Sequence, residues 1–100
     1  MEREIIIKAV KEIEERADKY IEEITTEGKS MRTQIIANGY ITGYIREMER
    51  RIENIKRYQE KLIELDARLM AYKHIAVETA DREIIELIQD TDDRIQKYMR

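Results

Sequence analysis

His74 is the only histidine in the chain, and Glu78 follows it at the spacing of one helical turn. Side chains four residues apart lie on the same face of a helix, so this pair could give two ligands to a metal ion. A metal site needs more ligands, and the chain has no second histidine and no cysteine to complete one. We therefore interpret His74 as a structural or surface residue and expect no metal site.

Carboxylates also lie close together in several places. The segment QDTDDR contains Asp90, Asp92 and Asp93, but it lacks the glycine and the closing glutamate of a calcium loop. The pairs Glu14–Glu15 and Glu22–Glu23 point in different directions on a helix, so neither pair suits acid–base catalysis. We find no nucleophile beside a base and no phosphate-binding loop. The sequence thus predicts no catalytic residue, no cofactor and no enzymatic activity.

Basic residues are concentrated in the middle of the chain, where residues 28–61 carry eight basic and four acidic side chains. On a helix, four of them would form one stripe: Arg46, Arg50, Arg57 and Lys61. Such a stripe could contact the phosphates of a nucleic acid. Two alternatives stay open, a solvated face diluted by acidic residues and a face that packs on the acidic outer segments. The net charge of −3 argues against nucleic acid.

Composition favours long helices as the elements that position these groups. Charged residues make up 41% of the 100 residues, whereas about 25% is usual in a globular domain. This balance is typical of helices with a narrow apolar stripe and wide solvated faces. The abundance of isoleucine and of charge also resembles a thermophile bias, although an AT-rich genome would favour isoleucine too.

The first expected helix covers residues 2–27. Its apolar residues recur at steps of three and four, the spacing of a coiled-coil or bundle stripe: Ile6, Val10, Ile13, Ala17, Tyr20 and Ile24. Two threonines and Gly28 follow, which favours an end at this point, and Ser30 could begin the next helix.

A long central helix is expected to reach residue 76. Its first half carries the stripe Ile41, Ile45, Met48, Ile52 and Ile55, and its second half carries Tyr58, Leu62, Leu65, Leu69, Tyr72 and Ala76. The first stripe, continued by heptads, meets the polar residues Gln59, Asp66 and Lys73. These could select the register of a partner helix. We favour the other interpretation, that the stripe moves sideways and leaves them exposed.

The segment Asn38-Gly39, followed by Gly43, interrupts this helical pattern. A β-hairpin is disfavoured because neither flank alternates apolar and polar residues. The remaining alternatives are a break, with helices over 30–37 and 40–76, and one continuous helix over 31–76 in which the glycines allow a close contact. We lean towards the break. In either case we expect this segment, with Tyr40 and Tyr44 beside it, to be a joint or a contact.

A last helix is expected over residues 80–98, with Thr79 as its cap. Its apolar stripe consists of Val77, Ala80, Ile84, Leu87, Ile88, Ile95 and Tyr98. The first and last helices would fold back on the central one, roughly end to end. The fold class is therefore an all-α, antiparallel, coiled-coil-like bundle of about three helices in a single domain.

This arrangement leaves apolar surface uncovered, so we expect a homodimer or a higher oligomer. The predicted self-association interface comprises Tyr40, Ile41, Tyr44, Ile45, Met48, Ile52 and Ile55. A second protein partner is also expected, as for an adaptor, a small subunit, or a viral or mobile-element protein. The longest apolar run is too short to cross a membrane, and the charged N-terminal segment does not resemble a signal peptide. Cytoplasm is the default compartment.

Overall fold

The chain folds into three α-helices in a computed structural model, and the predicted all-α fold is confirmed. Helix α1 covers Arg3–Asn38, α2 covers Thr42–Glu78 and α3 covers Arg82–Gln96. The structure describes residues 2–99 except 39–41, and for residues 34–38 and 42–44 the description is of the backbone only. Within these ranges there is no β-strand.

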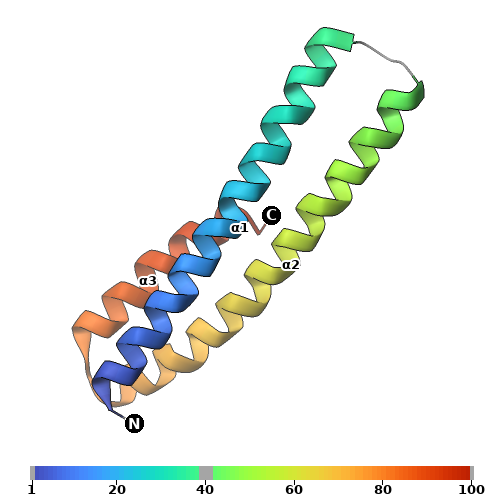
Figure 1. Cartoon of the computed structure of the whole chain (residues 1–100). Helices are drawn as coiled ribbons and strands as arrows, with labels where there is room; N and C mark the ends of the chain where they lie inside the picture. The colour runs from blue at the N-terminus through green and yellow to red at the C-terminus, as the bar shows by residue number, and fades with distance from the viewer. Residues whose placement is uncertain (1, 39–41, 100) are drawn as a thin grey trace.

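The helices form an elongated antiparallel bundle (Figure 1). α1 and α2 run side by side over their whole length, and α3 folds back beside them at the end that holds the N-terminus. The molecule measures 57 × 18 × 17 Å, and a helix of 37 residues is about 55 Å long, so α2 spans the full length. One half of the molecule therefore contains three helices. The other, which we call the two-helix half, contains residues 21–38 of α1 and 42–58 of α2.

This layout corrects the predicted arrangement, in which the outer helices would meet end to end on the central helix. α1 instead reaches along all of α2, because it is longer than the sequence indicated. The favoured break between two helices is present, since α1 ends at Asn38 and α2 begins at Thr42. The alternative of one continuous helix over 31–76 is wrong.

The core lies in the three-helix half. Its fully buried apolar residues come from the predicted stripes of all three helices: Ile6, Val10, Ile13 and Ala17 from α1, Leu62, Leu65, Leu69 and Ala76 from α2, and Ile84, Ile88 and Ile95 from α3. Thr91 is also buried there, and its hydroxyl donates to the carbonyl oxygen of Leu87 within the helix. The heptad spacing thus identified these buried residues, but Val77, which was placed in the stripe of the last helix, is 56% exposed, and the buried Thr91 was not predicted.

Gly28 does not end the first helix, contrary to the prediction, and residues 30–37 are part of α1. The threonines on either side fit the helix because each hydroxyl donates to the carbonyl oxygen four residues earlier, at 2.8 Å for Thr25 and 3.0 Å for Thr33. Beside Gly28, Glu27 forms an ion pair with Arg51 of α2, with 3.0 Å between Oε2 and Nη1. The neighbouring helix therefore supplies contacts that the local sequence does not reveal.

Replacing Gly28 by Ala should stabilise the protein by about 0.5–1 kcal/mol, because alanine loses less backbone entropy in a helix interior. A β-carbon at this position would meet no atom within 4 Å, so no steric cost opposes the gain. The measurement is urea denaturation followed by circular dichroism. A loss of stability would show that another chain approaches this position closely.

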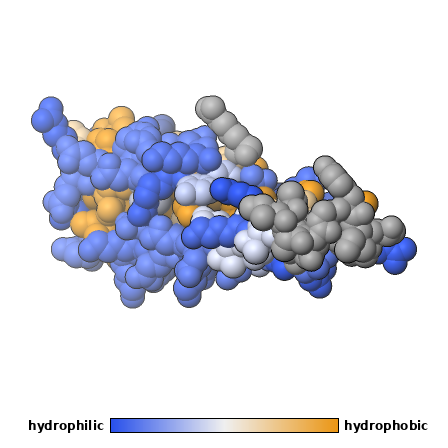
Figure 2. Space-filling view, turned by 90° about the horizontal axis from the view of Figure 1, so that it is seen from above, coloured by the Kyte–Doolittle hydropathy of each residue, from blue (hydrophilic) through white to orange (hydrophobic). Residues whose placement is uncertain are grey.

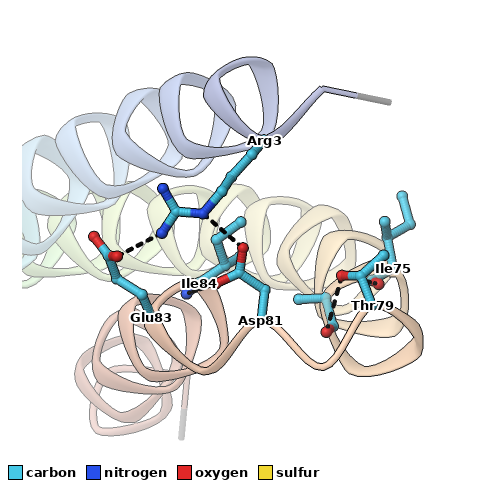
Figure 3. A network of polar contacts seen from close by, with 7 residues as sticks. Arg3, Ile75, Thr79, Asp81, Glu83 and Ile84 are labelled. Atoms are coloured by element: carbon cyan, nitrogen blue, oxygen red, sulfur yellow. Dashed lines mark hydrogen bonds and ion pairs between the residues drawn. The ribbon is translucent and has the colours of Figure 1, made fainter.

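The connection between α2 and α3 is a tight turn without glycine or proline (Figure 3). Ala80 has a φ of 55°, in the left-handed region, and its N–H donates to the carbonyl oxygen of Val77. The Asp81 N–H donates to the carbonyl oxygen of Ala76. This pair of hydrogen bonds is the Schellman arrangement, which usually has glycine at the position of Ala80. Because the chain has alanine there, sequence alone placed the break two residues early.

Asp81, and not Thr79 as predicted, caps α3. Its carboxylate accepts from the N–H of Ile84, and the Thr79 hydroxyl instead donates to the carbonyl oxygen of Ile75 at the end of α2. Arg3 at the start of α1 donates from Nε to Asp81 at 2.7 Å and also pairs with Glu83 (Figure 3). The hydrogen bond from Arg3 lowers the pKa of Asp81. One carboxylate therefore begins α3 and ties it to α1.

Candidate interaction surface

α3 covers one face of α2, and a line of polar residues marks that face. Gln59 donates from Nε2 to the carbonyl oxygen of Tyr98 at 3.0 Å. Asp66 accepts from Nε2 of Gln96 at 3.4 Å, and Lys73 donates from Nζ to Oε1 of Gln89 at 3.1 Å. Three α2 residues at heptad spacing thus bind successive parts of the last helix. We call Gln59, Asp66 and Lys73 the polar line.

The prediction that the polar line is exposed is wrong, because all three residues are partly buried beside α3. Burial and a hydrogen bond with Asp92 raise the pKa of Asp66 to about 7, and the positive charge of Lys73 opposes the rise. Gln96 also donates to Asp92, at 3.3 Å. The two carboxyl groups therefore lie together at the helix boundary, and a proton on Asp66 removes their repulsion.

The same face of α2 continues into the two-helix half, where α3 does not reach. Ile45 and Ile52 precede Gln59 at heptad spacing, and they are 47% and 40% exposed. Met48 and Ile55 lie beside them and are partly buried. We call Ile45, Met48, Ile52 and Ile55 the open face. In Figure 2, hydrophilic residues cover most of the surface in view, with hydrophobic residues between them.

Polar contacts hold α1 and α2 together next to the open face. Arg51 bridges Glu27 of α1 and Glu47 of its own helix, with distances of 3.0 and 3.1 Å. The rings of Tyr20 and Tyr58 pack against each other where the three-helix half begins, with centroids 6.0 Å apart. The two helices are therefore joined along this half without help from α3.

Several residues of the predicted interface and joint lie outside the described part of the chain. These are Tyr40 and Ile41 of the interface, Gly39 of the joint, and the side chains of Tyr44 and Asn38, while Gly43 is described by its backbone only. Of the predicted interface, Ile45, Met48, Ile52 and Ile55 are described, and all four belong to the open face.

All four residues of the basic stripe are exposed on α2. Nη2 of Arg50 lies 3.9 Å from a carboxylate oxygen of Glu47, and Nζ of Lys61 lies 3.7 Å from one of Glu64. These are long ion pairs between exposed side chains, so they hold the basic groups only weakly.

His74 and Glu78 are both exposed, with 3.1 Å between Nε2 and Oε1, as expected for a surface histidine. Among the described residues, no group of three or more acidic or histidine side chains is arranged to hold a metal ion. Asp93 accepts a hydrogen bond from Gln89 at 2.8 Å. None of the described helices has a segment long and apolar enough to cross a membrane.

No family model, curated protein or solved structure matches the chain.

Proposed function

We propose that the protein is a non-enzymatic, self-associating helical module that binds other protein surfaces through its open face. One observation carries the proposal: the face of α2 that α3 covers in one half of the molecule is apolar and uncovered in the other. Ile45 and Ile52 are exposed there, although the residues at the following heptad positions of α2 all contact α3 or the residues directly after it.

Burial of this face would favour association. Removing an isoleucine side chain fully from water contributes about 1.5–3 kcal/mol, and the two exposed residues would each gain part of this amount. Isolated exposed apolar residues are common on proteins, but two exposed isoleucines that continue a coiled-coil stripe with two partly buried apolar residues are typical of a helix that packs against another. Such a surface suits an adaptor or a small subunit of an assembly.

Replacing Ile52 by Asp should dissociate the assembly, because a carboxylate in an apolar contact loses its hydration without a partner. The matched control is Ile63→Asp, which changes an isoleucine of similar exposure, 49%, in the three-helix half of α2. Light scattering after size exclusion should give an oligomer for the native chain and the control, and a monomer for Ile52→Asp. A monomeric native chain at millimolar concentration would refute self-association.

A second candidate function is nucleic-acid binding by Arg46, Arg50, Arg57 and Lys61. The observation that favours it is their common exposure on α2, where Arg50 and Lys61 form long ion pairs with Glu47 and Glu64. Phosphate contacts would make the logarithm of the affinity fall linearly with the logarithm of salt concentration.

Fluorescence anisotropy with single-stranded and duplex DNA should show this slope, and Arg50→Glu with Arg57→Glu should abolish binding while leaving self-association intact. No binding at 20 mM salt would eliminate the candidate.

A further inference from the structure

We infer that the open face binds the open face of a second copy. The two α2 helices run antiparallel, and the two-fold axis lies at the level of residue 50 along α2. This inference rests on the proposed function and specifies its first partner. Three features support it: the point at which α3 ends, the different chemistry of the polar line and the open face, and the spacing of residues in the open face.

The end of α3 leaves a defined length of α2 uncovered. The last described contact of the α3 segment with the polar line is between the Tyr98 carbonyl and Gln59. Beyond Gln59, the open face runs from Ile55 to Ile45. The uncovered apolar stretch between these two residues is about 15 Å long. The occupant must therefore be a short helical surface that stops before Gln59.

The different chemistry of the polar line and the open face excludes the α3 helix of a second copy as the occupant. α3 brings Gln89 and Gln96 to Lys73 and Asp66, so its register is fixed by polar pairs. A second copy of α3 on the open face would set those amides against Ile45 and Ile52 and leave them without hydrogen-bond partners. The open face instead suits a helix that is apolar at the same positions.

The open face of a second copy meets this requirement when it runs in the opposite direction. The steps from Ile45 to Met48, Ile52 and Ile55 are three, four and three, and this spacing is the same in both directions. Antiparallel pairing about residue 50 places Ile45 opposite Ile55 of the second copy. It also places Met48 opposite Ile52, which gives four apolar layers.

The lengths of the helices favour this direction over a parallel one. In the antiparallel pair, Thr42 at the start of α2 in the second copy lies opposite residue 58, next to the end of α3. Each α3 and the two-helix half of the other copy would then lie end to end on α2. In a parallel pair the two α3 helices would occupy the same level of the same face and force the α2 helices apart. Because the interface is short, we expect a dimer that dissociates on dilution.

Spin labels can test the geometry, because the natural chain has no cysteine. Arg50→Cys and Glu64→Cys place a label at two exposed positions of α2. Arg50 lies on the side of α2 turned away from the open face, so pulsed electron resonance should give a distance between copies close to the width of the helix pair, about 20–24 Å, at position 50. At position 64 the labels should be separated by about 42 Å along the helix axis.

The outcomes separate the inference from the proposed function. Equal distances close to the width of the helix pair at both positions would show a parallel dimer and overturn the inference alone. Distances well above this width at both positions would place the contact on another surface and would also overturn the inference alone. Absence of any dipolar signal at high concentration would overturn both. Adding Ile52→Asp to the Arg50→Cys chain should raise the dissociation constant at least tenfold, whereas adding Ile63→Asp should leave it unchanged.

Discussion

Replacing Leu69 by Ala should lower the free energy of unfolding by about 2–5 kcal/mol. Leu69 is completely buried in the core of the three-helix half. Truncating it removes apolar contacts and leaves a cavity that rigid neighbouring helices fill only in part. Because a domain of this size is stable by about 5–15 kcal/mol, the variant should unfold at a clearly lower urea concentration.

The control for this prediction is Ile63→Ala, on the same helix but 49% exposed. We expect it to cost less than about 1 kcal/mol, because less apolar surface returns to water and no enclosed cavity forms. Both variants can be compared by urea denaturation at one protein concentration. Equal losses at the two positions would contradict the position of the core.

Replacing Asp66 by Asn should flatten the dependence of stability on pH. The pKa of Asp66 rises from 3.8 to about 7 in the folded protein, chiefly because burial disfavours its charged form. A raised pKa means that the folded state binds the proton more tightly than the unfolded state. The contribution of this group is therefore fully present below pH 3.8 and is lost as the pH rises through about 7.

Asparagine stays neutral at every pH, so the variant should gain stability relative to the native chain between pH 5 and pH 8. We expect a gain on the order of 1–2 kcal/mol at pH 8, a value reduced for the partial exposure of the carboxyl group. Thermal unfolding at several pH values measures it, with Asp90→Asn, an exposed aspartate on α3, as the control. Equal pH profiles for native and Asp66→Asn chains would show that Asp66 is ionised without cost.

The polar line links this pH dependence to the proposed interaction surface. Gln59, Asp66 and Lys73 hold α3 on one half of α2, and the isoleucines at the preceding heptad positions leave the other half for a different helix. A change from polar to apolar residues along one face would therefore separate the intramolecular contact from the proposed intermolecular one. Polar residues in helical seams select partners elsewhere by the same physical effect, since an unpaired buried polar group is costly.

The sequence by itself determined which residues face the core. Val10 and Ile13, Leu62 and Leu69, and Ile88 all lie on predicted stripes and are fully buried. This succeeds because the period of a helix is local, so the spacing of apolar residues fixes a face whatever packs on it. The same rule placed Ile45 and Ile52 on one stripe of α2, but it did not predict that these two residues are exposed.

Only the tertiary structure decided where the helices end and what each face meets. α1 continues through Gly28 because α2 provides contacts beside it, such as the Glu27–Arg51 ion pair, and these outweigh a cost of about 1 kcal/mol for glycine. Ala80 takes a left-handed conformation because the turn brings α3 back onto the core. The polar line is partly buried because α3 lies over it. In each case the energy comes from contacts between residues distant in sequence, and no local pattern encodes them.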